Sequence, residues 1–381
     1  MLEYHLLLDQ TSEGEIDGVT LPEPNMQLGP IHAQICARRG CGSISHISVA
    51  IYDPGNDLVK TFSESHSGSE SMGHHEAHLA DVATLLELNN SGRNYLINRL
   101  TAGGSPRLNM LYSRGIRSSM TVPVRCRDRL CGFIFFNSTE RGFFRRETID
   151  RLGPYAQLIS LLLVNQIATG RFARAITTMA IEMSRSRSDE SAVHLERMAR
   201  YARLTAVALA PKHRLSDEFV EHLFWYAPLH DIGKVAIPDA ILFKPGPLSR
   251  DERSEMELHV NKGVAILEGI VQEYGLDILP HAAMARNIIA YHHENVDGSG
   301  YPAGIEGSNI PIEARIVAIA DVFDALTSER PYKQKWTNED AVAHMLTFVG
   351  TKFDADCLEA FLSQMDKVNQ VQSRFQTRES H

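Results

Sequence analysis

The spacing of hydrophobic and polar residues in this chain changes near residue 165. Before that point, short apolar runs at residues 46–52, 119–125 and 130–137 are bounded by turn signals. Such runs predict the strands of an antiparallel sheet, and residues 76–100 between them read as helical or loop-rich. The first part of the chain is therefore expected to form an α+β domain.

The second part of the chain follows a helical period. From residue 146 to about residue 185, apolar side chains recur at steps of three and four, which predicts one long helix with Gly170 as its weak point. Its apolar stripe would either pair with a second copy in a homodimer or pack on the chain's own two domains, and both remain open. Beyond Ser188 the pattern is almost wholly helical, with loops expected at residues 238–249 and 297–311.

The charge of the chain limits the kinds of ligand that we expect it to bind. The chain has 38 basic and 47 acidic side chains and a formal net charge of -9. This balance gives no general attraction for nucleic acid or for an anionic membrane, so any phosphate group would be bound locally. The start of the chain lacks a signal-peptide pattern, and the most apolar run, residues 158–168, is too short to span a bilayer, so we expect a cytoplasmic protein.

Two clusters in the first half could carry other chemistry. The five cysteines, an odd number, predict reduced thiols, although Cys126 and Cys131 flank an expected hairpin tip and could form a redox bridge. His74, His75 and His78 could ligate a metal or haem, but their Ser, Gly and Glu neighbours favour an exposed loop.

Histidines and carboxylates in the second half occur in a combination typical of metal binding. His230 and Asp231 are adjacent after the apolar residues 223–226, and we expect a helix to deliver them side by side, with the aspartate bridging two metals. Mixed imidazole and carboxylate ligands suit first-row metals such as iron, manganese or zinc better than Mg²⁺ or Ca²⁺. Further candidate ligands in this half are Glu190, His194, His259, His292, His293 and Asp321.

Longer strings of residues around these positions resemble one enzyme family. The likeness is carried by residues 230–239, 244–246, 292–302 and 320–333. These strings are similar to those of the HD-GYP family, the branch of the HD phosphohydrolase superfamily that cleaves cyclic di-GMP, and the resemblance covers about residues 172–362. More loosely, residues 117–137 resemble the final hairpin of GAF sensory domains.

The two resemblances together imply a multi-domain protein. Its N-terminal α+β GAF-like sensory domain would be joined by a long helix to an all-α HD-GYP domain. The expected divisions are an N-terminal arm at 1–25, the GAF-like domain at 26–165, the connecting helix at 166–187 and the phosphodiesterase domain at 188–375.

The HD-GYP resemblance also implies which residues hold metal. The first metal would be held by His194, His230, Asp231 and Asp321, and the second by Asp231, His259, His292 and His293. Some family members carry a glutamate four residues before the first histidine and are described as taking a third metal. Glu190 occupies that position, so we expect three sites rather than two, the alternative being a glutamate that only stabilises its helix N-terminus. The implied cofactors are two or three divalent first-row ions, with iron expected before manganese.

The implied reaction is hydrolysis of cyclic di-GMP to pGpG, with GMP as the product of a second cleavage. Paired metals would generate a bridging hydroxide that attacks phosphorus, so no protein nucleophile is needed. Lys234 would stabilise the developing charge or protonate the leaving oxygen, and Tyr301 would stack on a guanine or bond a phosphate. The resemblance assigns Arg330 and Lys333 to the substrate phosphates.

Other functions stay open at this point. The chain could hydrolyse a different cyclic dinucleotide or guanosine tetraphosphate, or it could be a non-catalytic receptor for cyclic di-GMP. The Gly-Tyr-Pro loop argues against the tetraphosphate, and the complete set of expected ligands argues against the receptor. Diguanylate cyclase-type proteins are candidate partners, and the sequence does not identify a ligand for the GAF-like domain.

Overall fold

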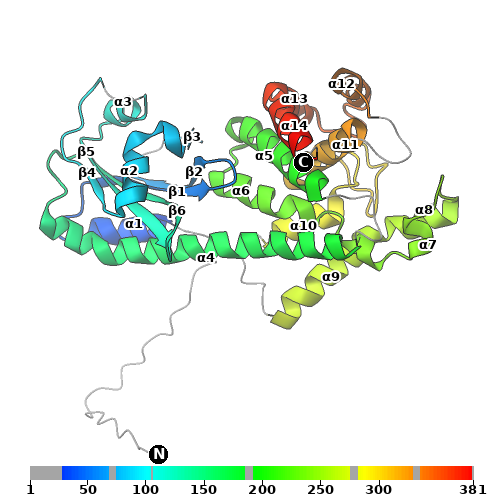
Figure 1. The fold of residues 1–381 in the computed structure, drawn as a ribbon, viewed down its shortest axis with the longest axis horizontal. Helices are drawn as coiled ribbons and strands as arrows, with labels where there is room; N and C mark the ends of the chain where they lie inside the picture. The colour runs from blue at the N-terminus through cyan, green and yellow to red at the C-terminus, as the bar shows by residue number, and fades with distance from the viewer. Residues whose placement is uncertain are drawn as a thin grey trace, which may run out of the picture.

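The computed structural model describes residues 28–67, 74–103, 106–184, 192–274, 282–328 and 335–379. Within these ranges, an N-terminal domain of sheet and helices is followed by a C-terminal domain of helices. The long helix α4 (Arg146–Ser184) runs along both domains (Figure 1). The predicted fold class, an α+β part joined by a long helix to an all-α part, is confirmed. The expected N-terminal arm, residues 1–25, lies outside the described residues.

The N-terminal domain is built on a 6-stranded sheet of order β3-β2-β1-β6-β5-β4. Its neighbouring strands are antiparallel, and the three predicted strands lie in β1, β5 and β6. Residues 76–100 contribute two strands that the sequence pattern did not predict, because each is only three residues long and shows no alternation. The elements are α1 (Leu28–Ala37), β1 (Ile44–Asp53), β2 (Leu58–His66), β3 (Glu76–His78), η1 (Leu79–Asp81), α2 (Ala83–Ser91), β4 (Tyr95–Ile97), α3 (Pro106–Ser113), β5 (Ser118–Cys126) and β6 (Arg129–Ser138).

The two faces of the sheet pack into different cores. Ile47 and Ile134 on one face belong to a large core that also contains Leu152 and Ile159 of α4. Phe133 on the other face belongs to a smaller core that includes residues of α2. All five cysteines are free thiols, as predicted.

Helix α4 packs on its own chain along much of its length. Leu152, Ile159 and Leu163 are fully buried in the large core, so this part of the apolar stripe packs on the chain's own domains. Gly170, the expected weak point, lies where α4 meets Trp225, and a Cβ atom there would clash with the indole ring. The glycine therefore permits close approach of the two helices rather than ending α4.

The C-terminal domain places α5 at its centre. Tyr201 of α5 packs edge-on against Phe323, which in turn packs against Phe361. The predicted loop at residues 238–249 contains a short helix, α7, which at four residues is too short to show a helical period. The elements are α5 (Ala192–His213), α6 (Asp217–Tyr226), η2 (Ala227–Leu229), η3 (Ile232–Ala236), α7 (Asp239–Leu242), α8 (Arg250–Glu257), α9 (His259–Tyr274), α10 (Ala282–Tyr291), η5 (Gly307–Asn309), α11 (Ile312–Thr327), α12 (Asn338–Leu346), α13 (Ala355–Leu362) and α14 (Met365–Glu379).

A cluster of buried charges joins the two domains beside α4. Lys60 of β2 lies 3.4 Å from Glu221 of α6, and Arg203 of α5 donates to the same carboxylate at 2.6 Å. Each buried charge faces an opposite one, as burial requires. We call this set the interdomain charge cluster, and its members are Lys60, His74, Glu76, Arg203, Asp217 and Glu221.

His74 belongs to this cluster and not to an exposed loop. Its side chain is 13% exposed and lies 2.6 Å from Asp217 and 3.6 Å from Glu76. The neighbouring Ser, Gly and Glu residues suggested exposure because the sequence does not show that α6 covers this segment.

Among the described helices, none combines the length and hydropathy required to cross a bilayer.

Candidate metal centre

His230 and Asp231 lie between two short 3-10 helices. Helix α6 ends at Tyr226, η2 ends at Leu229, and η3 begins at Ile232. The pair was expected on a helix, but it lies at the turn between these two 3-10 helices. Pro228 lacks an amide hydrogen and cannot continue the α-helical bonding pattern, so the chain tightens before it reaches His230.

Gly233 brings this turn close to the start of α9. A Cβ atom at position 233 would collide with the backbone oxygen of His259 and with the backbone of Gly263. Only a glycine allows η3 to lie directly on α9. This close packing places the Asp231 carboxylate beside the His259 imidazole.

The two oxygens of Asp231 face different histidines. Oδ2 lies 3.0 Å from Nε2 of His230, whereas Oδ1 lies 3.1 Å from Nε2 of His259 and 3.8 Å from Nε2 of His292. Asp231 is 5% exposed, so its carboxylate is largely shielded from solvent. The carboxylate is thus placed between two sets of imidazoles.

Two groups of side chains have the geometry to hold a metal ion. Within each group, ligand atoms of the side chains lie within 4.8 Å of one another. The structure brings together seven of the eight residues expected as metal ligands. One group is the set expected for the second metal, and the other is the set expected for the first metal without Asp231. The groups are Asp231, His259, His292 and His293, and His194, His230 and Asp321.

The ring nitrogens of the histidines are oriented by bonds on their far side. Nδ1 of His230 lies 3.0 Å from the Ala227 carbonyl oxygen, and Nδ1 of His259 lies 2.8 Å from that of Met256. Nδ1 of His292 likewise contacts the backbone at 3.0 Å. A carbonyl oxygen can only accept, so each Nδ1 carries a hydrogen and each Nε2 is turned toward Asp231, where the neutral imidazole has its lone pair.

Several polar atoms at the centre of the site make no hydrogen bond. Oδ1 of Asp231 and Nε2 of His259 and of His292 are buried and lack a hydrogen-bond partner. Buried polar atoms are normally satisfied, so a convergent set of unsatisfied acceptors indicates a missing electrophile. Imidazole nitrogen and carboxylate oxygen are donors that first-row divalent metals accept, and the residues therefore fit such ions.

Electrostatics favour the charge states that metal binding needs. Burial by itself would raise the pKa of Asp231, but Lys234 and His230 outweigh it and hold that pKa well below its usual value. Burial lowers the pKa of His292, and burial together with His292 lowers the pKa of His293 well below its usual value. The aspartate is thus ionised and these imidazoles are neutral near pH 7.

Asp324 orients the fourth imidazole, a role that the sequence did not reveal. Nδ1 of His194 lies 2.6 Å from Oδ2 of Asp324, and Arg197 donates to both oxygens of that carboxylate at 2.7 and 2.9 Å. Asp324 is fully buried on α11, one turn after Asp321. That spacing of three residues is the signal that could have pointed to it.

Two further expected site residues lie at the centre. Nζ of Lys234 lies 2.7 Å from Oδ2 of Asp231 and remains 26% exposed, so it also faces the solvent side. The ring of Tyr301 lies 4.7 Å from that of His293. Burial, helped by Asp231, raises the pKa of Tyr301 above its ordinary value, which keeps its hydroxyl a hydrogen-bond donor.

The loop that carries Tyr301 is held by Glu294. Oε1 of this buried carboxylate accepts hydrogen bonds from the backbone amides of Ala303 and Gly304 at 2.7 and 3.1 Å.

The remaining expected site residues lie outside the described residues. They are Glu190, Arg330 and Lys333.

Comparison with known families agrees with this arrangement. The family described as HD domain matches residues 185–357, which include both candidate metal groups. We refer to residues 185–357, the part of the chain that this family model matches, as the HD domain. The histidine and aspartate of the dipeptide at positions 230 and 231 lie at the centre of the site in this domain.

Curated relatives are similar to half of this chain or more. The "Cyclic di-GMP phosphodiesterase response regulator RpfG" of Xanthomonas campestris pv. campestris is 42% identical over 191 residues, covering 50% of this chain and 48% of the relative. The "3'3'-cGAMP-specific phosphodiesterase 2" of Vibrio cholerae serotype O1 is 35% identical over 255 residues, covering 63% and 47%. The chain spans about half the length of these relatives.

The N-terminal domain is similar to solved GAF domains at a greater distance. One is the crystal structure of the GAF domain from Acinetobacter phosphoenolpyruvate-protein phosphotransferase. It shares 16% identity at a TM-score of 0.31, covering 39% of this chain and 87% of that domain.

Proposed function

We propose that the HD domain hydrolyses the phosphodiester bond of cyclic di-GMP in a metal-dependent reaction. The observation that carries the proposal is the position of Asp231, whose two oxygens face two separate groups of imidazoles. A carboxylate in that position suits a bridge between two ions. The names of the curated relatives support phosphodiester hydrolysis of a cyclic dinucleotide.

The two ligand groups would each hold one ion. His194, His230 and Asp321 with Asp231 would bind the first, and Asp231 with His259, His292 and His293 would bind the second. Bound divalent ions would supply an ionised water nucleophile and neutralise the charge on the phosphate. Iron is the first expectation for their identity and manganese the second, because the ligands combine nitrogen and oxygen donors.

The side chains of the HD domain would bind and orient the substrate. Lys234 lies against Asp231 but is partly exposed, so its ammonium can reach a phosphate oxygen and donate a proton to the leaving oxygen. Tyr301 is held against His293, where its neutral hydroxyl can donate to a phosphate and its ring can stack on a base. Arg330 and Lys333 would bind the two phosphates of the substrate.

The second candidate function is hydrolysis of a different cyclic dinucleotide, 3'3'-cGAMP. One relative of this chain is named for cyclic di-GMP and another for 3'3'-cGAMP, so both substrates appear among the names of its relatives. We favour cyclic di-GMP because the relative with the higher identity carries that name. Its product would be pGpG, with GMP after a second cleavage.

The test is hydrolysis by the purified full chain loaded with iron or manganese. Wild type should cleave cyclic di-GMP, with 3'3'-cGAMP compared in parallel, and Asp231→Ala should abolish turnover because both ligand groups lose their shared carboxylate. Asp251→Ala, which removes an exposed carboxylate of α8, is the matched control and should retain activity. Equal turnover by wild type and Asp231→Ala would overturn the proposal, whereas preferential cleavage of 3'3'-cGAMP would change only the substrate.

Metal stoichiometry decides between two and three ions. Elemental analysis of wild type should give three ions per chain and Glu190→Ala two, if Glu190 is a ligand as we propose. An unchanged count in Glu190→Ala would leave only the two groups that share Asp231.

The proposal also covers control of the HD domain and pairing of two chains. We propose that the N-terminal domain, as a GAF-like sensor, controls the HD domain in the cytoplasm, and that α4 pairs two copies of the chain. Leu158, Leu161 and Phe172 of α4 are 43%, 67% and 68% exposed, which leaves an apolar surface for a second α4. Diguanylate cyclase-type proteins remain candidate partners. Light scattering of wild type and Leu161→Glu tests the pairing, since a monomer in both would contradict it.

A further inference from the structure

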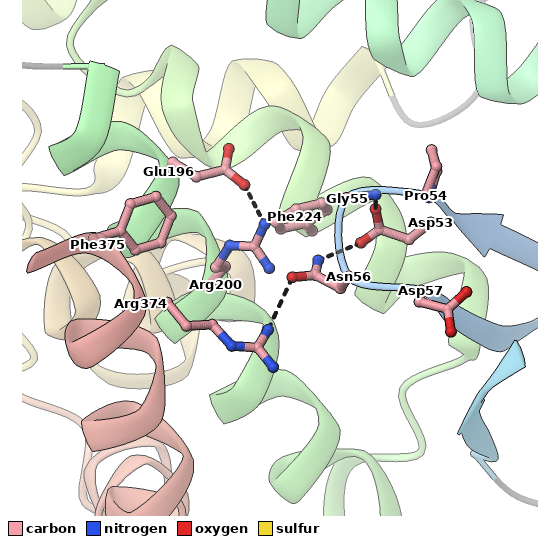
Figure 2. A pocket seen from close by; sticks show the side chains of 10 residues that line it. All are labelled: Asp53, Pro54, Gly55, Asn56, Asp57, Glu196, Arg200, Phe224, Arg374 and Phe375. Carbon is pink, nitrogen blue, oxygen red and sulfur yellow. Dashed lines mark hydrogen bonds and ion pairs between the residues drawn. The ribbon is translucent and has the colours of Figure 1, made fainter. Parts of the chain in front are cut away.

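A cavity of about 710 Å³ lies between the N-terminal domain and the HD domain (Figure 2). One wall is the turn between β1 and β2, residues 53–57, and the others come from α5, α6 and α14. None of its lining residues belongs to the two candidate metal groups. A cavity of this volume can enclose a molecule the size of a nucleotide.

Two guanidinium groups line this cavity. Cζ of Arg200 lies 5.9 Å from the ring centroid of Phe224 and 5.8 Å from that of Phe375, so the two rings flank its planar group. Nη2 of Arg200 donates to Glu196 at 2.6 Å, while its buried Nε makes no hydrogen bond. Figure 2 shows the guanidinium groups of Arg200 and Arg374 turned toward Asn56.

Arg374 bonds to a neutral amide, whereas Arg200 bonds to a carboxylate. Its Nη1 donates to the amide oxygen Oδ1 of Asn56 at 3.1 Å, and its side chain is exposed. In the part of the chain that the structure describes, no carboxylate forms an ion pair with it. Its charge is therefore available to an anion that enters the cavity.

The three carboxylates of the lining are already engaged. Asp53 lies 3.5 Å from Lys60 and accepts hydrogen bonds from Gly55 and Asn56. Asp57 accepts from the hydroxyl of Tyr52 and the amide of Ala80, and Glu196 accepts from Arg200. Each acid therefore has its own donors, although those of Asp57 are neutral, and Arg374 is the cation of the lining that is not paired with any carboxylate of the described residues.

We propose that this cavity binds a small phosphate-bearing anion of up to nucleotide size, held by Arg374 and Arg200. Phosphate accepts several hydrogen bonds from forked guanidinium groups, and an anion between two arginines offsets their mutual repulsion. The occupant would touch the β1–β2 turn on one side and α5 and α14 on the other, so it would hold the two domains together. Helix α5 also carries His194, which links the cavity to the metal centre.

The test measures binding without turnover, so it does not depend on the proposed phosphodiesterase reaction. The full chain carrying Asp231→Ala, which removes the shared metal ligand, is titrated with inorganic phosphate and with GMP by calorimetry. Saturable binding is expected, and adding Arg374→Ala should weaken it at least tenfold. Lys367→Ala removes an exposed cation of the same helix outside the cavity, and should leave the affinity unchanged.

A second variant avoids truncating a side chain. Asn56→Asp places a carboxylate against Arg374 and should also weaken binding at least tenfold, because the anion would compete with an internal ion pair. Tighter binding of GMP than of phosphate would indicate that the nucleoside part of GMP also contacts the cavity. Absence of saturable binding with both probes would overturn the proposal, as would an affinity that Arg374→Ala and Asn56→Asp leave unchanged.

Discussion

His194 and Asp324 form a short buried hydrogen bond, with 2.6 Å between Nδ1 and Oδ2. Asp324→Asn should reduce metal affinity about 10- to 100-fold, since the amide no longer fixes the imidazole with a charged acceptor. Titration of the chain with manganese, followed by elemental analysis, measures the change. Asp366→Asn, at an exposed position of α14, is the control. Wild-type metal affinity in Asp324→Asn would show that the bond does not orient the ligand.

Lys234 is expected to act on the substrate rather than on the metals. Lys234→Met should lower kcat by about 10²- to 10⁴-fold, the range for loss of a proton donor, with metal content unchanged. Lys212→Met is the control, since Lys212 is 60% exposed and lies outside the site. Steady-state kinetics together with metal analysis on the same samples checks the prediction, and a wild-type kcat would assign Lys234 a structural role.

Glu221 neutralises two buried cations at the domain interface. Glu221→Gln would leave Lys60 and Arg203 without their shared carboxylate, so we expect the free energy of unfolding to fall by about 3–5 kcal/mol. Glu268→Gln breaks the exposed pair with Arg286 and should cost less than about 1 kcal/mol. Urea denaturation compares the two variants, and equal losses would mean that the interdomain charge cluster adds no specific stability.

His74 should make the domain interface sensitive to pH. Burial alone would lower the pKa of His74, but the hydrogen bond to Asp217 and the nearby Glu76 carboxylate raise it from 6.5 to about 9, with Arg203 opposing them. Because the folded pKa is the higher one, the stabilisation is complete below about pH 6.5 and is lost as the pH rises through 9. It amounts to about 3 kcal/mol at most.

The measurement is the melting temperature of wild type and His74→Gln between pH 6 and 10. The two proteins should differ most at the acid end of this range, and the difference should shrink as the pH approaches 10. A difference that is constant with pH would contradict protonation of His74 in the folded chain.

Sequence patterns predicted only part of the fold, since the nine-residue strand β2 was not among the predicted strands. The strands β1, β5 and β6 follow from apolar runs bounded by turn signals, and the length of α4 follows from the helical period of its residues. The residues of the two metal groups were expected from their chemical types and from a family resemblance. Short elements such as β3, β4 and α7 escaped prediction, because a period needs more residues than they contain.

The sequence by itself therefore determined the order of domains and which side chains could bind metal. Only the tertiary structure decided that the His230–Asp231 turn lies on α9, that Asp324 supports His194 from 130 residues away, and that Lys60 meets Glu221 across 161 residues. The physical reason is that a local pattern reports which face of an element is apolar. It does not report which buried charges face each other once the elements pack.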